Sequence, residues 1–81
     1  MKFYYVYILQ SLNNHERYYT GFTENLQERL KQHNSGKCPH TSNYKPWRIK
    51  TTIAFTDCEK AQDFEKYLKT ASGRAFTKKR L

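Results

Sequence analysis

Glycine, proline and cysteine are scarce in this 81-residue sequence, which has three, two and two of them. So few glycines and prolines leave no low-complexity or linker tract, and the chain shows no internal repeat. Residues 1–12 lack the charged start and long apolar run of a signal peptide. Two cysteines without a secretory signal, Cys38 and Cys58, fit reduced thiols, so we expect a cytoplasmic protein.

Long hydrophobic runs are also missing, since no apolar stretch approaches the ~20 residues that cross a bilayer. The sequence is nevertheless 37% hydrophobic and 16% aromatic, and buried aromatic rings remove a large area from water. We therefore expect one folded domain over residues 1–81, with no membrane partner.

Acidic residues are few: seven Asp and Glu face fifteen Lys and Arg, giving a formal net charge of +8. Such an excess favours a polyanionic partner, most commonly nucleic acid. A generally soluble basic surface explains the composition equally well. A membrane-surface helix is a weaker interpretation, because the basic residues are spread along the chain and do not line one amphipathic helix.

The sequence predicts an α+β fold, with a three-stranded antiparallel sheet flanked by helices and a short C-terminal helix. Aromatic and β-branched residues predict strands, and capping residues with helical periodicity predict helices. The predicted elements, in order, are strands at 3–10, 17–22 and 48–55, and helices at about 24–35, about 57–72 and 74–81. The first two strands form a hairpin. Thr23 is the expected N-cap of the first helix, Thr56 begins a capping box, and Gly36 and Gly73 are the expected helix stops.

Polar residues occupy the apolar face of the first predicted helix. At about 100° per residue, Leu26 and Leu30 share one face with Arg29 and His33. The leucines define the side turned toward the sheet, so these two polar residues are candidates for a site. The alternative is that Arg29 lies at the edge of the stripe and extends to water.

The second predicted helix repeats this pattern, because Glu65 lies beside the apolar residues Ala61, Phe64 and Leu68. A carboxylate is rarely buried without a partner. That partner could be Arg29, a metal ion or a tyrosine. The alternative is an ordinary pair with Lys69 one turn later.

Strand tyrosines could join these groups on one concave surface, where alternation places Tyr5 and Tyr7 on the same strand face. Any single one of them is more often a core residue with its hydroxyl hydrogen-bonded. Together with an arginine, a histidine and a glutamate, they would suit phosphodiester hydrolysis, which needs a bound cation, charge stabilisation and an oriented water. Zinc is disfavoured, because Cys38, His40 and His33 lack the paired spacing of a structural site.

The ordered set of residues resembles the GIY-YIG nuclease domain over residues 3–81. The half-motifs are Tyr5-Val6-Tyr7 and Tyr19-Thr20-Gly21, and Arg29, His33 and Glu65 match the later helical positions. The sequence departs from the family pattern in three triplet positions. In addition, residues 72–81 contain no Asn where many members have one after the glutamate helix.

This resemblance implies a metal-dependent endonuclease acting on DNA, with a role in repair or recombination. Glu65 would hold Mg²⁺ or Mn²⁺, Arg29 would stabilise charge, Tyr19 or Tyr7 would position or deprotonate water, and His33 would hydrogen-bond a tyrosine or water. Basic residues outside this set would contact the nucleic-acid backbone without reading sequence: Lys37, Lys45, Arg48, Lys78, Lys79 and Arg80.

Two other functions fit the same residues. The missing Asn favours a nucleic-acid-binding module that kept the fold and lost turnover, whereas the intact Tyr7, Tyr19, Arg29, His33 and Glu65 favour an enzyme. A protein-interaction domain with a basic surface is the third hypothesis. Family members commonly carry a separate DNA-binding domain, so a protein partner could supply specificity here.

Overall fold

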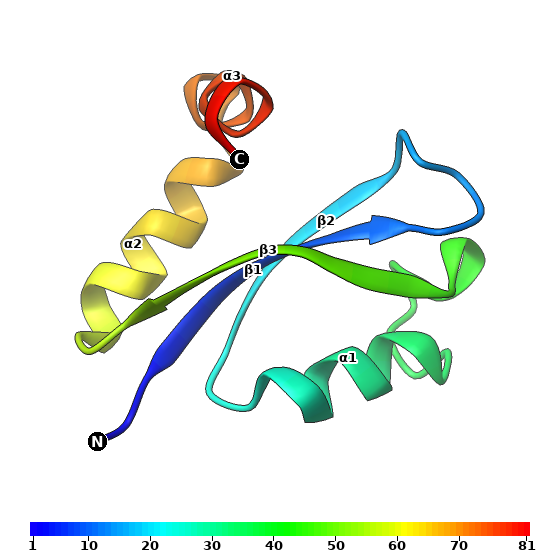
Figure 1. Cartoon of the computed structure of the whole chain (residues 1–81), viewed down its shortest axis with the longest axis horizontal. Coiled ribbons are helices and arrows are strands. Elements are labelled where there is room, and N and C mark those ends of the chain that lie inside the picture. The colour runs from blue at the N-terminus through cyan, green and yellow to red at the C-terminus, as the bar shows by residue number, and fades with distance from the viewer.

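The computed structural model describes residues 1–81 and contains a three-stranded antiparallel sheet with helices on both faces (Figure 1). Its elements are β1 (Tyr4–Ser11), β2 (Tyr18–Thr23), α1 (Leu26–Asn34), the 3₁₀ turn η1 (Ser42–Tyr44), β3 (Trp47–Phe55), α2 (Cys58–Leu68) and α3 (Ala71–Arg80). The predicted α+β class, strand pairing and element order are confirmed. No helix has both the length and the apolar character that a bilayer crossing requires.

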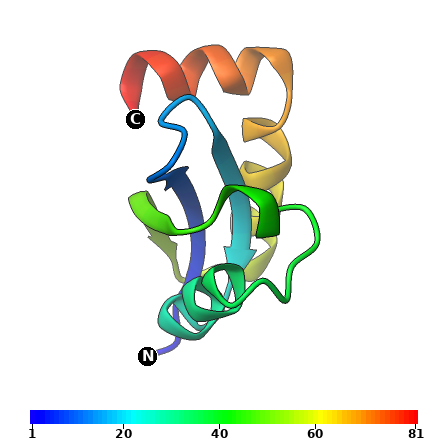
Figure 2. The same ribbon diagram turned by 90° about the vertical axis from the view of Figure 1, so that its right-hand side faces the viewer.

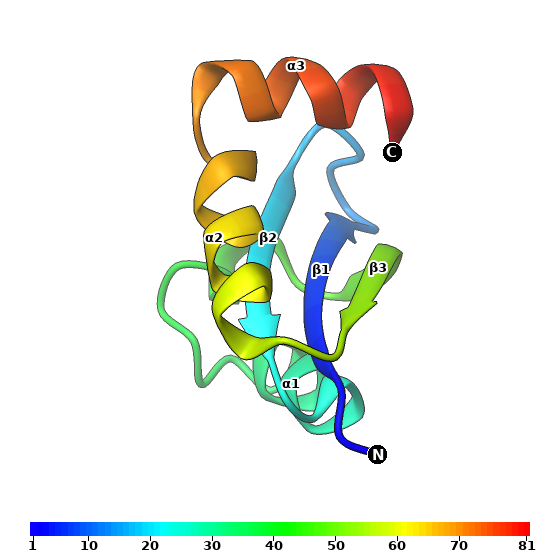
Figure 3. The same cartoon turned by 90° about the vertical axis from the view of Figure 1, so that its left-hand side faces the viewer.

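Strand β1 is the centre of the sheet, which has the order β2-β1-β3. In the register of the two pairs, Tyr7 on β1 lies opposite Gly21 on β2 and Thr52 on β3. Helix α1 covers one face, while α2 and α3 lie on the other (Figure 1). Helix α3 crosses the end of the molecule away from the N-terminus (Figures 2 and 3).

Two apolar clusters lie back to back across this sheet, because successive β1 side chains point to opposite faces. Val6 and Ile8 are buried on the α2–α3 side, where they pack with Ala61 and Leu68. Tyr7, Leu9 and Trp47 form the cluster on the α1 side, where Leu26 and Leu30 also pack. The predicted inward faces of both helices are therefore correct, and each face of β1 has its own set of neighbours.

The predicted N-cap of α1 is wrong by two residues. Asn25, not Thr23, caps the helix, since its side chain accepts a hydrogen bond from the Glu28 N–H. The Thr23 hydroxyl instead accepts from the Asn25 N–H and so shapes the turn that leads into the helix. At the other end, Gly36 has a φ of +82°, as expected for a glycine that follows a helix.

The predicted boundary between α2 and α3 is also wrong. Helix α2 begins at its cap Asp57 and ends at Leu68, well before Ser72. Thr70 caps α3 by accepting from the Gly73 N–H, so Gly73 lies inside α3 and does not terminate α2. A Cβ at this position would lie 1.9 Å from the Tyr67 carbonyl oxygen. Glycine is needed here because the two helices meet too closely for any side chain, a requirement that local sequence does not reveal.

Substitution of Gly73 by Ala should therefore destabilise the protein, although Ala normally stabilises a helix interior by about 1 kcal/mol relative to Gly. The added methyl group would force α2 and α3 apart, and overpacking of this kind costs about 1–3 kcal/mol. Urea unfolding would measure the difference, with Ser72→Ala, on the exposed side of the same turn, as the control. A stabilised Gly73→Ala variant would contradict this packing.

Candidate functional site

The tyrosines of both half-motifs lie on the α1 side of the β1–β2 pair. Tyr7 is 1% exposed, and its ring lies across Gly21, where a Cβ would come 2.4 Å from the phenol oxygen. The glycine of the second triplet is therefore required for space. Tyr19 is half-buried, and the centre of its ring lies 6.3 Å from that of Tyr7 and 4.8 Å from the His33 ring.

His33 joins Tyr7 to the loop after α1 through a buried hydrogen-bond chain. Its ring is fully buried, with Nε2 at 3.0 Å from the Tyr7 hydroxyl and Nδ1 at 2.8 Å from the Thr41 Oγ1. Thr41 is 1% exposed and donates its hydroxyl proton to the Cys38 carbonyl oxygen at 3.3 Å. Both ring nitrogens of His33 are thus occupied, which leaves neither for a zinc ion.

The Cys38 carbonyl at the end of this hydrogen-bond chain determines which group donates in each of its hydrogen bonds. A carbonyl oxygen can only accept, so the Thr41 hydroxyl donates to Cys38 and must accept from the His33 Nδ1–H. Neutral His33 then carries its lone pair on Nε2 and accepts from the Tyr7 hydroxyl. Thr41 therefore assigns the tautomer of His33, and Tyr7 is its donor.

Arg29 completes the cluster beside Tyr7. Its guanidinium donates to the Gln32 Oε1 at 2.7 Å and interacts with the Tyr7 phenol. Burial raises the pKa of Tyr7, and the Arg29 charge partly opposes that rise. The phenol in turn raises the pKa of Arg29, which is permanently charged. The structure thus brings together four predicted site residues: Tyr7, Tyr19, Arg29 and His33.

Burial, and to a lesser degree the Arg29 charge, lower the pKa of His33 below its ordinary 6.5. The unfolded chain takes up this proton near pH 6.5 while the folded protein resists it, so stability is lost as the pH falls below that value. We expect the loss to be at most about 1.4 kcal/mol per pH unit.

Urea unfolding at pH 7.5, 6.5 and 5.5 would measure this loss, with His33→Gln as the comparison because glutamine does not titrate. The wild type should lose more stability over this range than the variant does. Equal pH dependence in the two proteins would show that His33 is not held neutral.

Glu65 lies on α2, across the sheet from this cluster. Its side chain is 16% exposed and forms an ion pair with Lys69 at 2.6 Å, the i+4 pairing that the sequence left open. No group of three or more His, Cys, Asp and Glu side chains gathers here or elsewhere. Lys69 and Tyr19 nevertheless line the same groove, which passes around the edge strand β2. The groove therefore connects the α1 side of the sheet, where Tyr19 lies, with the α2 side, where Lys69 lies.

This groove has a volume of about 770 Å³ and contains basic residues that sequence reasoning missed. Four cations absent from the predicted backbone-contact set line it: Arg17, Lys50, Lys69 and Arg74. Of the predicted set, Lys78 alone lines it, and all six members are exposed. The i, i+4 spacing of Arg74 and Lys78 was a readable signal, because it places both on one face of the last helix.

This small α+β domain has the residues on which the resemblance to the GIY-YIG class of catalytic domain rests: Tyr7, Tyr19, Arg29, His33 and Glu65. The family model described as the GIY-YIG catalytic domain matches residues 3–80, and this chain belongs to that family.

Known proteins similar to this chain include UPF0213 protein BH0048 from Halalkalibacterium halodurans. The two are 38% identical over 71 residues, which cover 86% of this chain and 73% of the relative. The solution NMR structure of UPF0213 protein BH0048 from Bacillus halodurans is also similar, with a TM-score of 0.56 and 35% identity. That match covers 94% of this chain and 80% of the other.

Proposed function

We propose that this protein is a divalent-metal-dependent endonuclease that hydrolyses DNA phosphodiester bonds in the cytoplasm, in repair or recombination. The observation that carries the proposal is the cluster of Tyr7, Tyr19, Arg29 and His33 at an edge strand, beside a basic groove. Membership of the GIY-YIG family and the +8 formal charge support the same substrate class.

The carboxylate of Glu65 suits a hydrated hard cation better than a zinc site. Mg²⁺ often takes one or two protein carboxylates and fills its remaining positions with water and substrate phosphate. Glu65 would hold such an ion, with Lys69 displaced from its ion pair. When bound, Mg²⁺ or Mn²⁺ supplies positive charge to the phosphoryl oxygens.

The exposures of the two tyrosines support different roles for them in the proposed reaction. Tyr7 is buried, its hydroxyl is hydrogen-bonded to His33, and it raises the pKa of Arg29, so we infer that Tyr7 positions the guanidinium. Tyr19 lines the open groove and can meet water and substrate. Its hydroxyl would accept a proton from the attacking water as its own proton passes to solvent.

The proposed hydrolysis is a single displacement at phosphorus. The water oxygen bonds to phosphorus, the bond to the leaving sugar oxygen breaks, and that oxygen takes a proton from solvent. Arg29 stabilises the negative charge that develops on the phosphoryl oxygens, because a preorganised cation costs no reorganisation during the reaction. His33 stays neutral at pH 7, since its pKa is lowered, and keeps accepting from Tyr7.

A supercoiled plasmid, incubated with the protein and Mg²⁺ or Mn²⁺, tests this proposal. Nicking and linearisation that EDTA abolishes would support a metal-dependent endonuclease. No cleavage of plasmid, branched DNA or RNA, with salt-sensitive binding retained, would instead support a binding module that lost turnover.

A further inference from the structure

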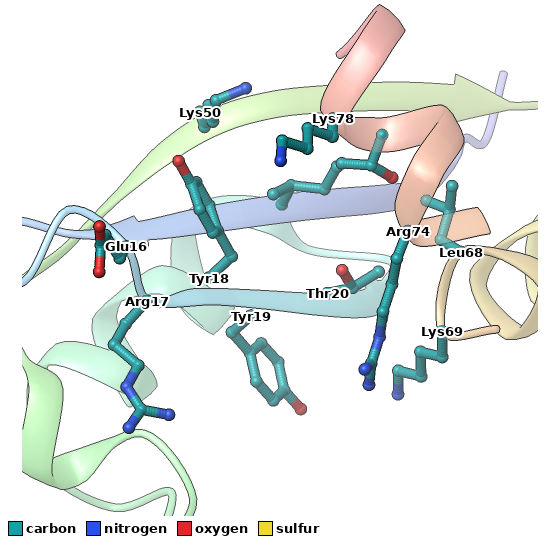
Figure 4. A pocket seen from close by; sticks show the side chains of 12 residues that line it. Glu16, Arg17, Tyr18, Tyr19, Thr20, Lys50, Leu68, Lys69, Arg74 and Lys78 are labelled. Atoms are coloured by element: carbon teal, nitrogen blue, oxygen red, sulfur yellow. The ribbon is translucent and has the colours of Figure 1, made fainter. Parts of the chain in front are cut away.

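The basic groove collects cations from four separate parts of the chain. Arg17 comes from the hairpin, Lys50 from β3, Lys69 from the residue after α2, and both Arg74 and Lys78 from α3 (Figure 4). Glu16 is the single acidic residue that lines it. Residues so far apart in sequence meet only through the fold, so the groove is a property of the tertiary structure.

These cations are largely without acidic partners. The structure has two ion pairs, Lys2 with Glu24 and Lys69 with Glu65, so four of the five groove cations have none. Arg74 and Lys78 are also one turn apart on α3, and like charges at this spacing destabilise a helix by a few tenths of a kcal/mol. Lys50 donates to the Leu81 carbonyl oxygen at 2.5 Å, and Arg17 lies over the Tyr44 ring. Arg74 and Lys78 have no such partner, and a bound polyanion would offset their repulsion.

Hydroxyl groups line the groove together with the cations. Tyr18 is 52% exposed, and Thr20 and Thr77 also line the wall. Hydroxyls and cations are the groups that proteins use to contact phosphate oxygens. No Asn or Gln side chain lines the groove, so it lacks the amides that pair with adenine edges.

Tyr19 connects this groove to the catalytic cluster. It lines the groove and also packs on His33, with ring centres 4.8 Å apart. In Figure 4, the side chains of Tyr19, Lys69 and Arg74 extend past β2 in the same direction, while those of Lys50 and Lys78 lie on the other side of the strand. The cations therefore surround β2 and continue to the edge where Tyr19 lies.

We propose that this groove binds successive backbone phosphates of nucleic acid and leads them around β2 to Tyr19. The inference rests on the proposed function and identifies the surface along which the nucleic acid would reach the proposed active site. The cations are spread over the hairpin, β3, α2 and α3, which suits a repeating polyanion better than a single small anion. Because phosphate contacts carry no sequence information, we expect binding through this groove to be independent of base sequence.

Fluorescence anisotropy with labelled DNA tests the proposal, using a duplex and a single strand of mixed sequence in EDTA over about 50–300 mM NaCl. The double variant Arg74→Ala/Lys78→Ala removes two groove cations. Lys60→Ala/Lys66→Ala is the control, since it removes two positive charges from exposed positions of α2 that lie outside both the groove and the predicted backbone-contact set. Circular dichroism would show that both variants are folded.

The groove variant should bind at least about tenfold more weakly at low salt, and the slope of log K against log salt should fall by about 1.5–2. The control should lose less than about threefold and keep most of the slope. Equal losses of DNA affinity in the two variants, or no DNA binding by the wild type, would overturn the proposal that the groove binds nucleic acid.

Because EDTA prevents metal-dependent cleavage, the binding result does not depend on turnover. If the groove variant binds DNA more weakly but the wild type never cleaves DNA, the endonuclease proposal is refuted and the proposal that the groove binds nucleic acid stands. If the wild type cleaves DNA and the groove variant binds DNA as tightly as the wild type, only the proposal that the groove binds nucleic acid is refuted.

Discussion

Plasmid cleavage should fall by at least about 10³-fold when Glu65 is replaced by Gln, to the level of wild type in EDTA. A bound cation supplies several kcal/mol of charge stabilisation, and each 1.4 kcal/mol or so is a tenfold change in rate. Gln keeps the size of the side chain but loses the charge that would hold the ion. Cleavage would be measured at several Mg²⁺ and Mn²⁺ concentrations.

Glu59→Gln is the matched control, because Glu59 is exposed in the first turn of the same helix. It should retain activity within about threefold, as surface changes away from special features are usually mild. DNA binding in EDTA should survive Glu65→Gln or become slightly tighter, because Lys69 loses its ion-pair partner and becomes free to contact phosphate. Glu65→Gln activity within tenfold of wild type would show that the cation is held elsewhere.

The second large effect should separate the two tyrosines. Tyr7→Phe and Tyr19→Phe should each lower the cleavage rate by about 10²-fold or more, since misplacing a catalytic group or losing a proton-transfer group costs this much. Their effects on stability should differ. Tyr7→Phe leaves Nε2 of the fully buried His33 without a donor, which costs about 1–3 kcal/mol. Tyr19→Phe leaves no such group.

Urea unfolding and single-turnover cleavage on the same preparations would make this comparison. Loss of activity with no loss of stability in Tyr7→Phe would mean that its hydroxyl does not anchor the buried chain. Full activity in Tyr19→Phe would show that the Tyr19 hydroxyl takes no part in the reaction and that another group accepts the proton from the attacking water. Either result would be clear, because the phenylalanine ring preserves the packing in both variants.

The sequence was sufficient to predict the fold and the cluster on α1. Leu26 and Leu30 show which side of the helix faces the sheet, so Arg29 and His33 could be located from periodicity alone. The roles of Tyr7 and Tyr19 could not be ranked, because both precede or follow β-branched residues in similar strands. Their difference arises from register, which places Gly21 opposite Tyr7 and gives that ring a space to fill.

The remaining features depend on contacts between distant segments. Thr41 lies outside every predicted strand and helix, yet it is buried and assigns the tautomer of His33. Lys50 and Arg17 have no local pattern that marks them as groove residues, because only sheet pairing and the placement of α3 bring them together. The requirement for glycine at position 73 also depends on tertiary structure, since the Tyr67 carbonyl that excludes a side chain belongs to the preceding helix.

The two apolar clusters across β1 have a consequence for cooperativity. Neighbouring residues Tyr7 and Ile8 belong to opposite clusters, so neither layer can detach without loosening the strand that supports the other. The molecule should therefore unfold as one unit, as small domains generally do. The proposed catalytic groups on the two layers would then lose their alignment together, so opening of one layer should not leave half of the proposed site intact.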